Sequence, residues 1–184
     1  MKNREIELKY ELTDSYSYTR LVRLTERFIR QFIPQPYGVF EGTATDKFWV
    51  LPGTKSDFVR LRSNADGHGE ITVKYTDKGL VSNRVEINVP TTSLDKGESF
   101  MQQLFGPHAL QLRKNFTIFS FMGSVEVSVY AVGNRVFLEI EAPTMKQVKD
   151  FRDALTFLRE YEPETRSLFQ IFTGVKKLPV RLVA

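Results

Sequence analysis

The feature that most constrains this chain is a set of segments in which charged and apolar residues alternate with a period of two. In segment 5–12, Glu-Ile-Glu-Leu-Lys-Tyr-Glu-Leu, every odd position is charged and every even position is apolar. Such alternation is typical of a β-strand with two different faces. Further strands are expected at 58–63, 70–75, 83–89, 111–118, 125–130 and 135–142, with a shorter aromatic one at 46–50.

The connections and the helical segments indicate how these strands are arranged. The stretches 65–69, Ala-Asp-Gly-His-Gly, and 76–79, Thr-Asp-Lys-Gly, are turn-prone, and short links join antiparallel neighbours. Apolar residues recur with helical spacing at 15–33, at 100–105, at 144–158 and between Pro163 and Gly174. This order predicts an α+β fold built around an antiparallel sheet.

The helices suggest where the charged strand faces point. Arginine and glutamate recur at i, i+2 in strand after strand, whereas a face in contact with water usually carries a looser mixture of polar residues. Each helix has an apolar stripe that needs an apolar surface to cover, so the charged faces would turn away from the helices. A sheet of about eight strands can close around one small ligand. We expect a closed eight-stranded antiparallel β-barrel with a charged lumen and helices packed outside; the alternative is a half-exposed sheet.

Size and composition narrow the class of protein. A chain of 184 residues favours one domain, expected at 1–175, followed by a short basic tail at 176–184. Hydrophobic content of 41% and charged content of 26% are ordinary for a soluble protein. The sequence has no apolar run of the roughly 20 residues that a membrane helix needs. It has no cysteine and no apolar signal segment at its start, so we expect a cytoplasmic protein without disulfides or thiolate metal sites.

The charged faces carry a combination that suits phosphate chemistry. Buried charges are costly unless they pair with each other, with water or with a ligand. Arg and Lys bind phosphate oxygens, and carboxylates bind Mg²⁺ or Mn²⁺, which bridge phosphates. The net charge of +4 agrees with an anionic partner. The pattern therefore indicates phosphoryl transfer by positioning and electrostatics, without a covalent nucleophile.

Six short motifs, in order along residues 3–142, give a resemblance to a known family. They are Glu5-Ile6-Glu7-Leu8-Lys9, Asp46-Lys47-Phe48-Trp49, Arg60-Leu61-Arg62, Lys74, Arg84-Val85-Glu86 and Phe137-Leu138-Glu139-Ile140-Glu141. This set resembles the CYTH superfamily, or triphosphate tunnel metalloenzymes. The family comprises thiamine triphosphatases, inorganic triphosphatases, class IV adenylyl cyclases and RNA 5′-triphosphatases, all built on an eight-stranded antiparallel tunnel.

The resemblance implies different ligands for different charged residues. Those implied to hold Mg²⁺ or Mn²⁺ are Glu5, Glu7, Glu139 and Glu141, with Glu126 as a further candidate. Those implied to hold the triphosphate are Lys9, Arg60, Arg62, Lys74, Arg84 and Arg113. The residues expected to take part in catalysis are Glu7, Lys9 and Glu86.

Three positions depart from the family pattern. Asn88 stands where the family often has a second glutamate on its fifth strand. On the sixth strand we expect only Arg113 to point inward, because Lys114 fits the family's basic pair only after a shift of register. The seventh strand has 128–130, Ser-Val-Tyr, where the family has an aspartate, which leaves Glu126 as the nearest acid on the same face.

The expected activity is hydrolysis of the terminal phosphoryl group of tripolyphosphate or of a nucleoside or organic triphosphate. Alternatives are a class IV-like adenylyl cyclase, an RNA 5′-triphosphatase, a non-catalytic triphosphate-binding module and a structural β-domain with a solvated charged face. The expected partner is a small-molecule triphosphate. We do not expect the chain to bind a membrane, and we expect it to bind nucleic acid only if an RNA 5′-triphosphate is the substrate. We expect a monomer or a homodimer.

Overall fold

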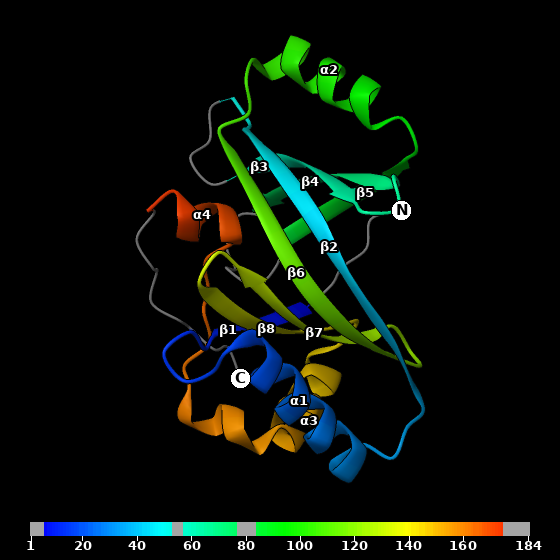
Figure 1. Cartoon of the computed structure of the whole chain (residues 1–184), viewed down its shortest axis with the longest axis vertical. Coiled ribbons are helices and arrows are strands. Elements are labelled where there is room, and N and C mark those ends of the chain that lie inside the picture. Colours follow the sequence, from blue (N-terminus) through cyan, green and yellow to red (C-terminus); the bar gives the residue numbers. More distant parts are fainter. Residues whose placement is uncertain (1–5, 53–56, 77–83, 175–184) are drawn as a thin grey trace. The chain divides into compact units, whose positions relative to one another are not determined.

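A computed structural model of the chain describes residues 6–52, 57–76 and 84–174 (Figure 1), and only the backbone of 74–76 and 84–86. Its strands are β1 (Ile6–Glu11), β2 (Tyr37–Val50), β3 (Phe58–Asn64), β4 (Gly69–Thr76), β5 (Arg84–Thr91), β6 (Leu110–Phe121), β7 (Val125–Val132) and β8 (Arg135–Ala142). Its helices are α1 (Tyr18–Phe32), α2 (Leu94–Phe105), α3 (Met145–Ala154), the 3₁₀ helix η1 (Thr156–Glu160) and α4 (Leu168–Phe172). The expected tail at 176–184 lies outside the described residues.

The strands form an antiparallel sheet, which confirms the α+β class. Over the described residues the hydrogen-bonded order is β1-β8-β7-β6-β2-β3-β4-β5, so β1 and β5 are the ends of the sheet. The outer edge of β1 is met by Glu164, whose backbone N–H donates to the carbonyl of Lys9 at 2.6 Å. Because no pairing of β1 with β5 is found in this part of the chain, closure into a barrel is not confirmed.

The chain folds as two compact units. The β7–β8 unit comprises Glu5–Gly42 and Lys114–Glu164, and the β3–β4 unit comprises Thr43–Arg113 together with residues from Thr165 onward. Strands β2 and β6 contribute residues to both units. The expectation of one domain over 1–175 stays a prediction.

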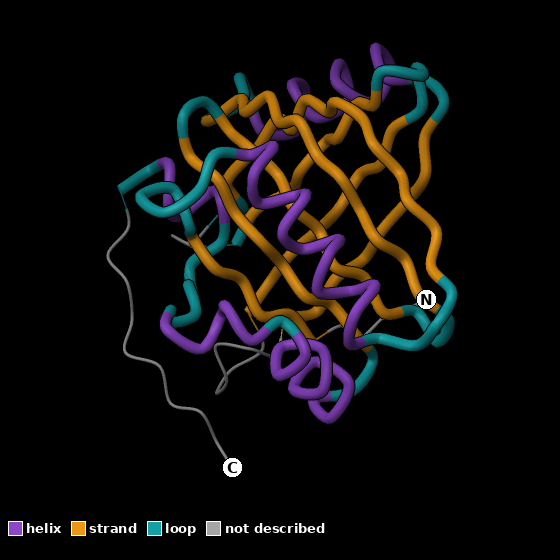
Figure 2. Tube along the Cα trace, turned by 60° about the horizontal axis from the view of Figure 1, so that its bottom comes forward, coloured by secondary structure: helices purple, strands orange, loops and turns teal. Residues whose placement is uncertain are grey.

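In the β7–β8 unit, α1 and α3 cover the apolar face of the strands. α1 begins at the N-cap Ser17 and buries Leu21 and Ile29 completely, while α3 begins where the Thr144 side chain accepts a hydrogen bond from the N–H of Gln147. α1 contacts β7, and α3 contacts β8 and β1 (Figures 1 and 2). Each aliphatic side chain buried in this core contributes about 1.5–3 kcal/mol.

The alternation of β8 decides which side of this unit is polar. Leu138 and Ile140 are fully buried in the core shared with α1 and α3. Because successive strand residues point to opposite faces, Glu139 and Glu141 lie on the side away from these helices. Within this unit the apolar strand faces therefore turn to the helices, as the sequence pattern predicts.

The β3–β4 unit has helices on both faces of its strands. α2 packs on one face, where Met101 joins Trp49, Val59 and Leu61 in a buried cluster. On the other face, which also carries the arginines of β3, α4 places the ring of Phe169 next to two aromatic residues. Its centroid lies 5.8 Å from that of Phe48 and 5.6 Å from that of Phe58. These aromatic residues give α4 an apolar surface on an otherwise polar face, so not every helix packs on the apolar side as expected.

Several helix and strand bounds differ from the sequence-based expectation. The helix expected at 144–158 ends as α3 at Ala154 and continues as the separate 3₁₀ helix η1. The last helix begins not near Pro163 but at Leu168, after a capping box between Ser167 and Gln170. None of the helices in the described part of the chain is long and apolar enough to cross a membrane.

Candidate functional site

Three glutamates lie side by side across strands β1, β8 and β7. In the register of the sheet, Glu141 is opposite Glu7 of β1 and also opposite Glu126 of β7. Directly opposed residues of antiparallel strands share one face and have Cβ atoms about 4.5–5.5 Å apart. Glu7, Glu141 and Glu126 therefore form a row of carboxylates, called here the acidic row, which occupies the face away from α1 and α3.

Lys9 supplies positive charge next to the acidic row. Its Nζ lies 2.7 Å from Glu139 Oε1 and 3.2 Å from Glu7 Oε1, and its side chain is only 4% exposed. Like charges that face each other across strands are destabilising, and a buried ammonium is tolerated only when it is paired. The lysine and the glutamates thus stabilise one another. Glu139 lies directly opposite Lys9 in the register, two residues along β8 from the acidic row.

Strand β6 completes this face on the far side of β7. The hydroxyl of Ser120 donates to Glu126 Oε1 at 3.2 Å, because the two residues are opposite each other in the register. Farther along, Phe116 is opposite Tyr130, and Lys114 lies two residues before Phe116, so Lys114 shares their face. The Nζ atom of Lys114 lies 5.4 Å from the centre of the Tyr130 ring.

This register corrects the expectation for the sixth strand. Arg113 precedes Lys114, so it alternates to the other side of β6, and its side chain is exposed. Lys114 is therefore the basic residue that β6 contributes to the face of the acidic row. The buried Phe119 and Phe121, at odd positions like Arg113, belong to the core under α1 and α3. These two phenylalanines are the sequence signal that odd positions of β6 face the helices.

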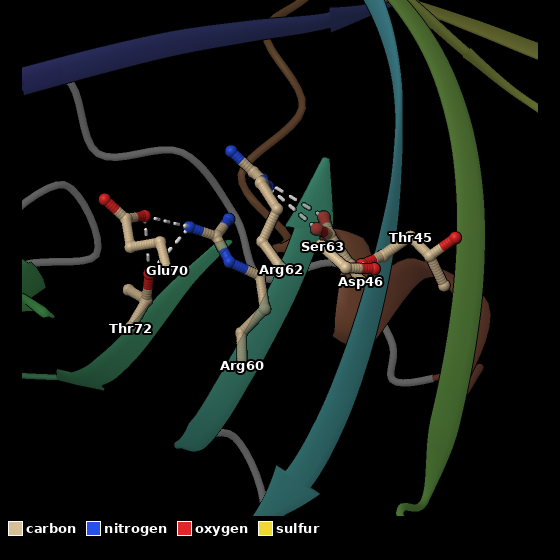
Figure 3. A network of polar contacts seen from close by, with 7 residues as sticks. All are labelled: Thr45, Asp46, Arg60, Arg62, Ser63, Glu70 and Thr72. Atoms are coloured by element: carbon tan, nitrogen blue, oxygen red, sulfur yellow. Dashed lines mark hydrogen bonds and ion pairs between the residues drawn. The ribbon is translucent and has the colours of Figure 1, made fainter. Parts of the chain in front are cut away.

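In the β3–β4 unit, two arginines of β3 are each held by acceptors from the neighbouring strands (Figure 3). Arg62 binds Asp46 of β2 in a bidentate pair, with Nε 2.8 Å from Oδ1 and Nη2 3.1 Å from Oδ2. The two residues are directly opposite in the register. Asp46 is 1% exposed and Arg62 is 24% exposed, so the carboxylate is buried beneath the guanidinium and fixes its plane.

Arg60 is held from the other neighbouring strand. Its Nη2 donates to Thr72 Oγ1 at 2.8 Å and lies 3.3 Å from Glu70 Oε1, and both acceptors come from β4 (Figure 3). Thr72 in turn donates to Glu70 at 3.0 Å. Together with Arg62 and Asp46, these residues are called the arginine network. Charge-assisted hydrogen bonds of this kind pre-order cationic groups for binding anions.

The geometry of the β3–β4 hairpin depends on one glycine. A Cβ atom at Gly69 would lie 2.4 Å from the backbone oxygen of Arg62 and 2.3 Å from a methyl carbon of Leu94. Only a residue without a side chain allows β4 and α2 to approach β3 this closely. Gly69 therefore sets the spacing of the strands that carry the arginine network.

The remaining residues predicted for the site fall on parts that the structure describes partly or not at all. Glu5 lies outside the described residues. For Lys74, Arg84 and Glu86 only the backbone is described, and in it Lys74 is opposite both Phe58 and Glu86. Their roles stay predictions.

The chemistry of the acidic row suits a hard divalent cation. Mg²⁺ and Mn²⁺ prefer carboxylate oxygens, and Glu7, Glu141 and Glu126 present three such groups as neighbours. Among the described residues, no three acidic or histidine side chains already converge as a metal-binding group. The row thus provides the required donors, and its side chains would have to turn toward a bound ion.

Solved structures with the same architecture place this geometry in a known fold. The PH1012 protein from Pyrococcus horikoshii is 19% identical and superposes with a TM-score of 0.70 over 90% of this chain and 98% of its own. A proposed adenylate cyclase from Vibrio parahaemolyticus is also 19% identical, with a TM-score of 0.67 over 94% of this chain and 99% of its own. HpAC1 from Hippeastrum is 16% identical, with a TM-score of 0.59 over 97% and 98%.

These likenesses define the class of fold. Structures of this group are CYTH-type proteins, so the chain has the CYTH-type fold that its motifs resemble. No protein-family model matches the sequence, and no curated protein matches it.

Proposed function

We propose that this chain is a divalent-cation-dependent enzyme that hydrolyses the terminal phosphoryl group of tripolyphosphate or of a nucleoside or organic triphosphate. The observation that carries the proposal is the acidic row, in which Glu7, Glu141 and Glu126 are direct cross-strand neighbours. Neighbouring carboxylates on one sheet face repel one another, and a bound divalent cation would offset this repulsion. Bound Mg²⁺ or Mn²⁺ would polarise a phosphoryl oxygen and lower the pKa of a bound water.

The proposal gives each group of residues one task. The cation would be held by the acidic row with Glu139, and by Glu5 as the family resemblance implies. The phosphate oxygens would be bound by Arg60, Arg62, Lys74, Arg84 and, from strand β6, Lys114 in place of Arg113. Glu86 remains a candidate for orienting the attacking water.

The held arginines support this reading, because phosphoryl transfer depends mainly on positioning and electrostatics. Asp46 accepts two hydrogen bonds from Arg62, so the guanidinium plane is fixed before any substrate arrives. Thr72 and Glu70 do the same for Arg60. Preorganised cations cost little reorganisation when charge develops on phosphate oxygens.

Lys9 would act where cation and phosphate meet. It is buried and paired with Glu7 and Glu139, so it offsets the repulsion between these carboxylates while no cation is bound. An ammonium in this position can also bind a phosphate oxygen brought in with the cation. Lys9 is therefore assigned to substrate binding and to charge stabilisation.

An adenylyl cyclase is the second candidate. The Vibrio parahaemolyticus structure is described as a proposed adenylate cyclase, and HpAC1 as an adenylyl cyclase candidate with a dominant triphosphatase activity. Both reactions use the same triphosphate and differ in the nucleophile. Hydrolysis of ATP releases orthophosphate, whereas cyclisation releases pyrophosphate and cyclic AMP.

The test is a panel of substrates with the products identified. The purified chain is incubated with tripolyphosphate, ATP, GTP, thiamine triphosphate and 5′-triphosphorylated RNA, with Mg²⁺ and Mn²⁺ in separate series. We expect cation-dependent orthophosphate release that Glu141→Gln lowers about a hundredfold or more, while Glu160→Gln, an exposed glutamate of η1, leaves it unchanged. Release that is independent of divalent cations, or undiminished in Glu141→Gln, would contradict the proposal. Pyrophosphate with cyclic AMP would favour the cyclase.

A further inference from the structure

One buried hydroxyl on the face of the acidic row has no part in the function proposed so far. Tyr130 of β7 is 2% exposed. Its ring stacks on that of Phe137, with centroids 5.2 Å apart and planes at 20°, and Lys114 Nζ lies 5.4 Å from its centre. These contacts fix the ring, so the position of the hydroxyl is fixed as well.

This hydroxyl has no well-formed hydrogen bond. Among the described residues no group meets hydrogen-bond geometry with the buried Tyr130 Oη, and the carboxylate of Glu139 approaches it without completing that geometry. Buried tyrosine hydroxyls usually find a partner, and each exception calls for an explanation. A partner that arrives only with a ligand is one such explanation.

The position of Tyr130 in the sheet directs this hydroxyl toward carboxylates. Tyr130 lies two residues after Ser128, which is opposite Glu139, so Tyr130 and Glu139 are diagonal neighbours on one face, within reach of long side chains. A tyrosine phenol has an ordinary pKa of about 10, so its hydroxyl is a protonated donor at neutral pH.

The nearby acceptors already have another donor. Lys9 Nζ lies 2.7 Å from Glu139 Oε1 and 3.2 Å from Glu7 Oε1. A cation entering the acidic row would bring new oxygen atoms into this region, either from water or from phosphate. Those oxygens are acceptors, and one of them would give the hydroxyl of Tyr130 the well-formed hydrogen bond that it does not make in this structure.

We propose that Tyr130 is a positioning residue of the acidic row, whose hydroxyl donates a hydrogen bond to an oxygen atom carried into the site by the bound cation. This inference rests on the proposed function. It assigns a role to a residue at which the chain departs from the family pattern, because Tyr130 belongs to the segment that stands where an aspartate is usual. The oxygen belongs to either water or phosphate, and the experiment separates the two.

The test compares Tyr130→Phe with a matched control. Tyr10→Phe also removes a buried hydroxyl that makes no well-formed hydrogen bond in the same unit, but Tyr10 faces the helix-covered core. Melting temperature and dissociation constants are measured with no ligand, with Mn²⁺ alone, and with Mn²⁺ plus tripolyphosphate. Without ligand, Tyr130→Phe is expected to melt at or above the wild-type temperature, because it removes a buried polar atom that makes no well-formed hydrogen bond.

With ligand the two variants should separate. In Tyr130→Phe the ligand-induced rise in melting temperature should be smaller by about 2–4 °C, and binding about five- to tenfold weaker. Tyr10→Phe should keep the wild-type rise. A deficit already present with Mn²⁺ alone identifies a water oxygen as the acceptor; a deficit that needs tripolyphosphate identifies a phosphate oxygen.

Other outcomes overturn the inference. If wild type responds to ligand and Tyr130→Phe responds equally, the hydroxyl has no role in the site, and the proposed function stands. If wild type shows no response, the proposed function fails and the inference fails with it. Phe137→Leu provides a second variant, because it keeps the hydroxyl but removes the stacking that fixes the ring; an undiminished response there would also contradict the positioning role.

Discussion

Arg62 and Asp46 are joined by two hydrogen bonds, from Nε at 2.8 Å and from Nη2 at 3.1 Å. The carboxylate is almost fully buried, whereas a quarter of the arginine side chain is exposed. The pair therefore has an inner anchor and an outer cation. This asymmetry explains how a basic residue can be held rigidly and still present charge to an anion.

Replacing the anchor should loosen the arginine without removing it. In Asp46→Asn the bidentate, charge-assisted pair becomes a weaker neutral one, and we expect a loss of about 1–3 kcal/mol in the free energy of unfolding. The KM for tripolyphosphate should rise more than kcat falls. Denaturant unfolding and steady-state kinetics measure the two effects. Asp95→Asn, an exposed residue in the first turn of α2, is the control and should change neither by much.

The glycine of the β3–β4 hairpin should tolerate no side chain. In Gly69→Ala the new methyl group meets the backbone oxygen of Arg62 at 2.4 Å, and overpacking of this kind costs about 1–3 kcal/mol. Gly38→Ala is the control, because nothing lies within 4 Å of a Cβ there. Thermal unfolding compares the two variants, and equal melting temperatures would show that β3 and β4 can separate at no cost.

Lys9 should matter more for stability when no cation is present. Lys9→Met leaves Glu7 and Glu139 without their shared ammonium, and loss of one partner of a buried ion pair costs about 3–5 kcal/mol. Divalent cations should restore part of this loss in Lys9→Met. Lys146→Met breaks the exposed pair of α3 with Asp150 and should cost only about 0–1 kcal/mol. Melting curves with and without Mg²⁺ test both; a loss in Lys9→Met that cations leave unchanged would argue against a cation site at these glutamates.

Stability should fall at alkaline pH because buried tyrosines resist ionisation. Burial raises the pKa of Tyr10 and of Tyr18 above the ordinary value. A pKa that is higher in the folded than in the unfolded state gives stability that is complete below about pH 10 and is lost as the pH rises through the folded-state pKa. Unfolding measured between pH 8 and pH 12 should show this loss, and Tyr10→Phe should reduce it. Tyrosinate absorbance that rises equally in folded and unfolded protein would contradict the prediction.

The strands with regular alternation could be predicted from the sequence. In β1 and β8 every second residue is apolar, because one face packs under helices and the other carries the charges. That regularity identified Glu7, Glu139 and Glu141 as residues of one face. The sequence could not show that Glu126 would be opposite Glu141, because register is fixed by turn length and by packing between strands.

Other parts of the fold left weaker signals. Strand β2 extends from Tyr37 to Val50, but its first half contains two glycines and no strict alternation, so the sequence pattern predicts only 46–50. The helix α4 is five residues long and is held by contacts of Phe169 with residues distant in the sequence. In β6, alternation counted from the first residues of the strand predicts that Arg113 points inward, whereas alternation counted from Phe119 and Phe121 places Lys114 on that face.

The ammonium of Lys9 is a counterion of Glu7 and Glu139 that the chain itself provides. Under the proposed function, a divalent cation that approaches Glu7 and Glu139 would meet carboxylates that already have a counterion, so its binding would be an exchange. Affinity for the free ion would then be lower than the number of carboxylates alone suggests. A triphosphate would lower the cost of this exchange, since its oxygens would accept hydrogen bonds from the displaced ammonium, and ion and substrate would therefore favour each other's binding.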